Sequence, residues 1–328
     1  MVGHIHIPPF APREDVRHVV SVSGGKDSTA TYLLCLEQTG GDFDAVFADT
    51  GNEHPYTYEY VARLHERTGG PRVHTVKADF TADLVRKRTY LESGRATSRA
   101  VNPWTDNRVR EVLAMDFEPT GIPFLDLCRS HGFFPSHQWA FCSHRLKRLP
   151  VLGYQQSLID NEGYHIISWQ GIRAEESVRR SCYPMWEPSP DMEGVTLYRP
   201  LMGWTVEDVV AMHRRHGLKL NPLYGLGFNR VGCMPCIQSN KHDIRVTAQK
   251  CPEAINKIRE WDHIVQAYSR LGRVSFFRQC IAGNYVPVDI DEVVRWSKTI
   301  RGGRQFDILS LADPPTSEVC IYAGGLCE

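Results

Sequence analysis

The fold of this chain is decided by the stretch His18-Val-Val-Ser-Val-Ser-Gly-Gly-Lys-Asp-Ser28. Its first five residues form a β-branched run that predicts a strand, and residues 29–37 predict a helix. Two successive glycines directly after a strand let the backbone turn tightly and present several N–H groups to an anion, at the positive end of the helix dipole. The stretch therefore predicts a phosphate-binding loop, made of Ser23, Gly24, Gly25, Lys26, Asp27 and Ser28.

The rest of the chain alternates apolar runs with helix-like stretches. Strands are predicted over 44–48, 72–76 and 163–169, and helices over 56–67, from Thr205 onward and over 255–271. This alternation favours an α/β fold with a doubly wound, mostly parallel sheet. The segment 89–135 is rich in Arg, Pro, Gly and Asn, and it predicts an inserted or mobile loop region.

Three regions are expected along the chain. A lead-in covers residues 1–15, and a nucleotide-binding domain that contains the insertion covers residues 16–230. Residues 231–328 form a cysteine-containing, largely helical region with a glycine-bearing tail.

Composition narrows the class of protein. Lys+Arg and Asp+Glu both total 38, so the net charge gives no reason for strong nonspecific binding to nucleic acid. The sequence contains no secretion signal and no apolar stretch approaching a membrane helix, so we expect a cytoplasmic protein without membrane contact. Its ten cysteines are then expected to be thiols, metal ligands or catalytic groups rather than disulfides.

The phosphate loop departs from the Walker A pattern, which needs a glycine where this chain has Val20. The sequence Ser23-Gly-Gly-Lys-Asp-Ser28 instead resembles the signature of the PP-loop ATP pyrophosphatases, which have an adenine nucleotide alpha hydrolase-like fold and cleave ATP between the α and β phosphates. Within that superfamily the chain resembles the phosphoadenylylsulfate (PAPS) reductase family. The further matching elements are Asp49-Thr50-Gly51, Gly171-Ile-Arg173, Arg199-Pro-Leu201 and Asn221-Pro-Leu-Tyr224.

The resemblance implies roles for individual residues. Lys26, Asp27 and Arg173 would act in catalysis on ATP, with Asp27 holding Mg²⁺ beside the leaving pyrophosphate. The implied nucleotide-binding residues are Ser23, Gly24, Gly25, Ser28, Asp49, Thr50, Gly51, Gly171 and Arg179. A solvated arginine is the competing interpretation for Arg173 and Arg179. Sulfonucleotide reductases usually replace the Lys-Asp pair of the loop, so its retention here favours ATP.

The cysteines suggest a second centre. Cys233-Met-Pro-Cys236 has the ligand spacing of zinc and iron–sulfur sites. Cys142 lies in a segment that resembles the one supplying cluster ligands in iron–sulfur members of the family. A 4Fe-4S cluster held by these three cysteines is therefore predicted, with Cys182 or Cys251 as a possible fourth ligand. Structural zinc and free thiols remain the alternatives.

Three functions are compatible with these features. The leading one is an ATP pyrophosphatase that adenylates a substrate and transfers sulfur, similar to DNA-phosphorothioation sulfur-transfer enzymes. Its implied partners are a nucleic-acid substrate and a sulfur donor such as a cysteine desulfurase. The second is a thioredoxin-dependent PAPS or adenylylsulfate reductase, in which Cys320 or Cys327 would resemble the catalytic tail thiol. The third is a non-catalytic nucleotide-binding module of a larger complex.

Overall fold

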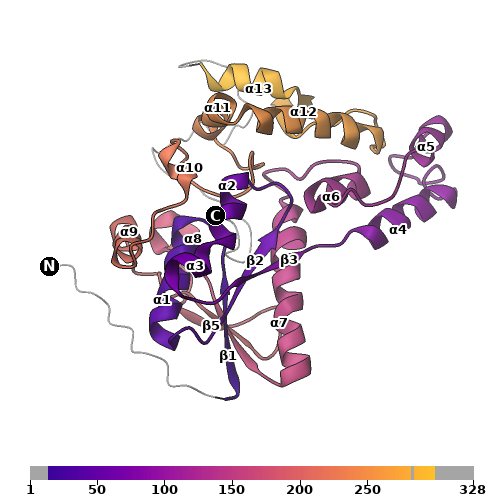
Figure 1. The fold of residues 1–328 in the computed structure, drawn as a ribbon. Helices are drawn as coiled ribbons and strands as arrows, with labels where there is room; N and C mark the ends of the chain where they lie inside the picture. Colours follow the sequence, from indigo (N-terminus) through magenta and orange to yellow (C-terminus); the bar gives the residue numbers. More distant parts are fainter. Residues whose placement is uncertain (1–13, 282–283, 300–328) are drawn as a thin grey trace.

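The computed structural model of the chain describes residues 14–281 and 284–299. A six-stranded sheet lies at its centre, with the strand order β3-β2-β1-β4-β6-β5 (Figure 1). The strands are β1 (Val16–Ser21), β2 (Asp44–Asp49), β3 (Val73–Lys77), β4 (His165–Trp169), β5 (Trp186–Pro188) and β6 (Val195–Tyr198). Every pair in this sheet is parallel except β5–β6. The predicted mostly parallel α/β sheet is confirmed.

The predicted β-branched strand is β1, and it lies at the centre of the sheet. It pairs with β2 on one side and β4 on the other, and Val19 and Val20 are fully buried. Val20 packs with the apolar side chains of α1 (Lys26–Thr39), whereas Val19 packs with Val151 of α7 (Leu149–Glu162). Strands that are covered by helices on both faces carry continuous rather than alternating apolar residues.

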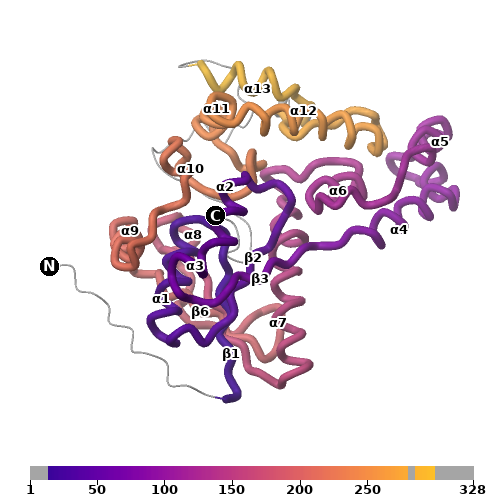
Figure 2. Tube along the Cα trace, in the orientation of Figure 1, coloured from indigo at the N-terminus to yellow at the C-terminus, as the bar shows by residue number. Residues whose placement is uncertain are grey.

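A second, largely helical unit lies beside the sheet. It combines α4 (Thr81–Glu92), α5 (Asp106–Leu113) and α6 (Pro123–His131) with α11 (Lys241–Lys250), α12 (Pro252–Ala267) and α13 (Ile290–Ser297). The two groups of helices come from distant parts of the sequence, and Figures 1 and 2 show α6 and α12 side by side. The ring of Phe124 on α6 stacks on Trp261 of α12 with centroids 5.5 Å apart.

The helices α5 and α6 correct one expectation. The segment 89–135 is not a loop: it holds both of these helices and the end of α4. Their apolar side chains, such as Val112 and Leu127, are fully buried in cores completed by residues of α12 and the turn that follows it. A hairpin of β7 (Phe277–Ile281) and β8 (Asn284–Val288), which was also not predicted, lies in the same unit.

A half-buried lysine joins three of these helices. Lys87 on α4 donates hydrogen bonds to the backbone oxygens of Arg129 on α6 and of Tyr268, which ends α12. Both oxygens belong to last turns of helices, where carbonyl groups lack partners within the helix. Burial lowers the pKa of Lys87 to about 7.

The remaining described elements are short. They are α2 (Pro55–Ala62), α3 (Leu64–Thr68), the π-helix η1 (Ser143–Arg148), the 3₁₀ turn η2 (Ala174–Glu176), α8 (Val178–Ser181), α9 (Val206–Arg215) and α10 (Pro222–Gly225). The helix predicted from Thr205 onward is confirmed: Thr205 is the N-cap of α9 and forms a capping box with Asp208. Among residues 14–281 and 284–299, no helix is both long and apolar enough to cross a bilayer.

The exit of β4 lies against the first turn of α1. A Cβ added to Gly171 would be 2.9 Å from both the Cα and the backbone nitrogen of Ser28. Real Cβ atoms do not approach backbone atoms so closely, and backbone cannot rotate away as a side chain can. Gly171 is therefore required for β4 and the phosphate loop to pack together.

We predict that Gly171→Ala lowers the free energy of unfolding by about 1–3 kcal/mol, because the new methyl group overpacks the Ser28 backbone. Gly153→Ala is the matched control: Gly153 lies within α7, and a Cβ there meets nothing within 4 Å. The control should be neutral or more stable by about 0.5–1 kcal/mol. Denaturant unfolding measures both variants, and equal stability of the two would contradict the assigned packing.

Candidate functional site

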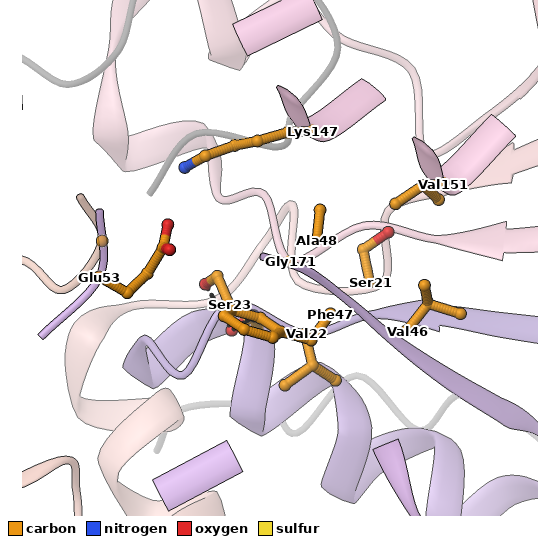
Figure 3. Close-up of a pocket in the computed structure, with 12 residues that line it drawn as sticks. Ser21, Val22, Ser23, Val46, Phe47, Ala48, Glu53, Lys147, Val151 and Gly171 are labelled. Atoms are coloured by element: carbon orange, nitrogen blue, oxygen red, sulfur yellow. Dashed lines mark hydrogen bonds between the residues drawn. The ribbon is translucent and has the colours of Figure 1, made fainter. Parts of the chain in front are cut away.

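A pocket lies at the carboxyl ends of β1, β2 and β4. Its lining comprises Ser21, Val22, Ser23, Ser28, Val46, Phe47, Ala48, Glu53, Lys147, Val151, Gly171 and Gly232 (Figure 3). The chain runs from β1 to its neighbour β2 on one side and later returns to β4 on the other side. Such a reversal of strand order leaves a crevice at the carboxyl ends of the strands, where open α/β sheets bind ligands.

The predicted phosphate loop forms one wall of this pocket. Gly24 has a φ of 79°, and a Cβ there would be 2.9 Å from Thr57 Cγ2. The Ser23 amide donates to Ser28 Oγ over 3.1 Å, and the two serine hydroxyl oxygens are 2.9 Å apart. The N-cap of α1 is Gly25, which has no side chain to cap the helix. The loop is thus closed across its ends and points the start of α1 toward the pocket.

A buried carboxylate links the loop to the exit of β4. Asp27 is fully buried; its Oδ1 accepts a hydrogen bond from Arg173 Nε, and its Oδ2 lies 2.7 Å from Lys26 Nζ. All three predicted catalytic residues are therefore in contact. Both oxygens of Asp27 face cations, so Asp27 can bind Mg²⁺ only if Lys26 moves away. Lys26 is the more accessible cation, with 19% of its side chain exposed, whereas Arg173 is buried.

The two predicted phosphate-binding arginines are placed differently. Arg173 contacts Asp27 and, through NH1, Glu175 over 2.8 Å. Arg179 lies on an exposed position of α8, and its neighbour Arg180 is the buried one, paired with Glu176. Arg173 therefore contacts the phosphate loop, whereas Arg179 lies at an exposed position.

Residues from far along the chain hold the outside of the loop. The Lys26 amide donates to the Tyr224 hydroxyl over 3.0 Å, and Asn221 Nδ2 donates to the Gly24 oxygen over 3.2 Å. His213 Nε2 donates to the Lys26 oxygen over 2.8 Å. Burial lowers the pKa of His213 and thereby favours its neutral ring. Asn221 and Tyr224 belong to the late family element, whereas His213 carried no signal in the sequence beyond its place on an amphipathic helix.

The Asp49-Thr50-Gly51 turn forms the opposite edge of the site. Asp49 accepts from the Gly51 amide over 2.8 Å and from Tyr58 over 2.7 Å, and it pairs with Lys77 over 2.7 Å. Burial alone would raise the pKa of Asp49, but these partners lower it overall. The carboxylate is thus charged and held in place at the end of β2.

Two residues of this site were not predicted, Glu53 and Lys147. The buried Glu53 carboxylate accepts from Thr50 Oγ1 over 2.7 Å and from the Tyr58 hydroxyl over 3.1 Å. Lys147 comes from the π-helix η1, a rare conformation that is common at functional sites. Figure 3 shows its side chain extending over the pocket toward the side on which Glu53 lies. In the sequence, Lys147 was distinguished only by its position in the basic segment of residues 145–148.

The structure places Cys233 and Cys236, two of the three predicted cysteine ligands, on one turn. Residues 53 and 233 form an isolated β-bridge, and Cys233 Sγ lies 3.5 Å from Thr50 Oγ1 and 3.6 Å from Glu53 Oε1. Cys236 Sγ accepts from the Gln238 amide over 3.4 Å. Burial raises the pKa of Cys233 to about 12, while Lys147 acts in the opposite direction. The Cys-x-x-Cys turn therefore lies at the pocket.

The other candidate cysteines differ in environment. Cys142 is half-buried at the start of η1, and Cys182 is exposed. Cys251 is buried between α11 and α12, where it groups with His54 and Glu253. Cys320 and Cys327 lie outside the described residues.

Comparisons with known proteins match most of the chain to one family. Residues 17–117 and 129–239 match the phosphoadenosine phosphosulfate reductase domain. The chain is 39% identical to an uncharacterized 37.8 kDa protein of Escherichia phage 186, over 96% of this chain and 98% of that protein. It is 28% identical to the uncharacterized nin region protein ORF290 of Escherichia phage lambda, over 74% of this chain and 72% of that protein.

Named enzymes are matched over shorter stretches. Adenosine 5'-phosphosulfate reductase of Allochromatium vinosum is 35% identical over 71 residues, which is 21% of this chain and 27% of that protein. The crystal structure of PAPS reductase from Candida auris, a phosphate complex, aligns with 68% of this chain and 82% of that chain, at 17% identity and a TM-score of 0.39. The reductase domain matches well over half of the sequence, and the chain is therefore a member of the PAPS reductase family of the PP-loop superfamily.

Proposed function

We propose that this chain is an ATP pyrophosphatase that adenylates an acceptor. The observation that carries the proposal is the contact of Lys26, Asp27 and Arg173 at the phosphate loop. Pyrophosphate is a highly charged leaving group, and its departure needs cationic groups that are already in position. The loop retains the Lys-Asp pair, and Arg173 fixes that pair from the exit of β4.

In this proposal the reaction is a single displacement at the α phosphorus. A lone pair of the acceptor forms a new bond to that phosphorus, the bond to the bridging oxygen breaks, and pyrophosphate leaves with the electron pair. The loop amides and the hydroxyl groups of Ser23 and Ser28 bind phosphate oxygens. Lys26 turns from Asp27 toward the leaving group, while Arg173 keeps the Asp27 carboxylate neutralised.

Magnesium would add further neutralisation of the phosphates, and Asp27 is the loop residue with the oxygen chemistry to hold it. Both Asp27 oxygens are taken by cations in the present arrangement, so no step is assigned to the ion.

Lys26→Ala should lower pyrophosphate release from ATP by at least about a hundredfold, because the mobile cation of the loop is lost. Lys250→Ala, at an exposed position in the last turn of α11, is the control and should retain full release. Enzyme-coupled detection of pyrophosphate in the presence of candidate acceptors measures both. Undiminished release by Lys26→Ala would refute the proposed role of the loop.

The acceptor chemistry is proposed to be sulfur transfer. Cys142, Cys233 and Cys236 would hold an iron–sulfur cluster, which would supply sulfide next to the adenylated acceptor. Two observations bear on the fit: Cys233 and Cys236 share one turn at the pocket, but the Glu53 carboxylate beside Cys233 opposes a thiolate there. A cysteine desulfurase would be the sulfur donor, and nucleic acid is the proposed acceptor.

Anaerobic purification followed by iron and acid-labile sulfide analysis tests the cluster. We expect both elements in the wild-type chain, their loss in Cys233→Ser, and their retention in Cys182→Ser, whose thiol is exposed on the surface. A colourless, iron-free protein that transfers sulfur would exclude the cluster.

The second candidate is reduction of adenylylsulfate or PAPS with thioredoxin as electron donor. It is favoured by the local similarity to proteins named adenosine 5'-phosphosulfate reductase. This reaction needs a tail thiol, whereas adenylation by ATP does not. If the chain is a reductase, Cys320→Ser or Cys327→Ser abolishes thioredoxin-dependent release of sulfite from the sulfonucleotide. Pyrophosphate release from ATP that both variants retain would instead favour the pyrophosphatase.

A further inference from the structure

Three metal-binding side chains from distant parts of the sequence meet beside the candidate site. His54 is the N-cap of α2 and follows Glu53, Cys251 lies between α11 and α12, and Glu253 is in the first turn of α12. One ligand atom from each lies within 4.8 Å of the other two. Among the described residues, His54, Cys251 and Glu253 are the group of His, Cys, Asp or Glu side chains whose three ligand atoms come this close together. Neither the phosphate loop nor the Cys-x-x-Cys turn contributes to it.

The distance between His54 and Glu253 is closer to that of two ligands of one metal ion than to that of a hydrogen bond. His54 Nε2 and Glu253 Oε1 are 3.8 Å apart, which is too long for a hydrogen bond. Bonds of about 2.0–2.2 Å from a tetrahedral zinc ion place a nitrogen and an oxygen ligand atom roughly 3.3–3.5 Å apart. The His54–Glu253 separation is thus about 0.3–0.5 Å longer than that of two ligands of one ion, and the sulfur needs to move by about 1.2 Å at most.

The chemistry and accessibility of the three groups also fit. An imidazole nitrogen, a thiolate and a carboxylate form a donor set that zinc and related borderline-soft divalent ions prefer. Cys251 is buried and His54 has 11% of its side chain exposed, whereas Glu253 is 66% exposed. An ion could thus enter from the Glu253 side. The thiolate and carboxylate would offset the two positive charges of the ion, and the neighbouring Lys257 adds one further positive charge.

Binding would change one existing hydrogen bond. The Tyr56 amide donates to His54 Nδ1 over 3.1 Å, so in this state the ring hydrogen is on Nε2. An ion on Nε2 requires the hydrogen to move to Nδ1, which can then no longer accept from Tyr56. The cap of α2 and the ion therefore compete for the same imidazole.

We propose that His54, Cys251 and Glu253 form a zinc-class metal site, with a fourth position filled by water. The ion would displace the thiol proton of Cys251 to solvent and bind the thiolate. His54 belongs to the nucleotide-binding sheet unit, whereas the other two ligands belong to the helical unit. The ion would therefore tie the start of α12 to the turn that carries Asp49 and Glu53.

Cobalt(II) titration of the full chain tests the site, because a thiolate on tetrahedral Co²⁺ gives a near-ultraviolet charge-transfer band together with visible d–d bands. The titration uses metal-free protein carrying Cys233→Ser and Cys236→Ser, so that the other candidate centre cannot respond. We expect one Co²⁺ per chain with both sets of bands. We also expect added Zn²⁺ to displace the Co²⁺ and to raise the melting temperature.

Single substitutions in that background identify the ligands. Cys251→Ser should remove the charge-transfer band, and His54→Asn should weaken Co²⁺ binding by at least about tenfold. Asparagine is a favourable N-cap, so His54→Asn removes the ligand while it preserves the start of α2. Cys182→Ser is the control and should leave the bands unchanged. The proposal is overturned if the background protein gives no thiolate band, or if either His54→Asn or a folded Cys251→Ser binds Co²⁺ as the background does.

Discussion

The buried Asp27 carboxylate is the interaction on which the rest of the site depends. A charge that is removed from water is tolerated only when partners neutralise it, and here the partners are Lys26 and Arg173. Arg173 comes from the exit of β4, so the pair fixes the distance between that exit and the phosphate loop. Gly171 makes the same approach possible by leaving room for the Ser28 backbone. The Asp27–Arg173 ion pair and the close packing at Gly171 thus both fix the position of the phosphate loop relative to the exit of β4.

Much of the sheet unit could be predicted because its signals are local. The run around Val19 and Val20 is apolar on both faces since β1 is covered on both faces, and the following glycines turn where the helix must begin. The helical unit could not be predicted in the same way. α5 is short, and its buried Val109 and Val112 pack with Tyr268, which is more than 150 residues away. A short amphipathic segment whose partners are so distant resembles a loop in the sequence.

The same distinction applies to the site. The residues of the phosphate loop lie on one continuous motif, and the structure brings Lys26 and Asp27 of this motif into contact with Arg173. Glu53 and Lys147 were missed because they reach the pocket through tertiary packing, Glu53 from the turn before α2 and Lys147 from η1. Cys251 was predicted only as a possible fourth ligand of the cluster, and its grouping with His54 and Glu253 depends on where α12 begins. The sequence shows which residues are chemically able to be ligands, whereas the fold determines which of these residues lie close together.

The outer supports of the phosphate loop have a consequence for how the protein is made. Tyr224, Asn221 and His213 bind the loop from 198, 197 and 187 residues further along the chain. Chains generally begin to fold from the N-terminus while the ribosome is still synthesising them. A nascent chain that has folded β1, α1 and β2 would still lack the three side chains that hold Gly24 and Lys26. The phosphate loop therefore acquires these supports late in translation, and an incomplete chain released before residue 213 would carry the intact loop sequence without them.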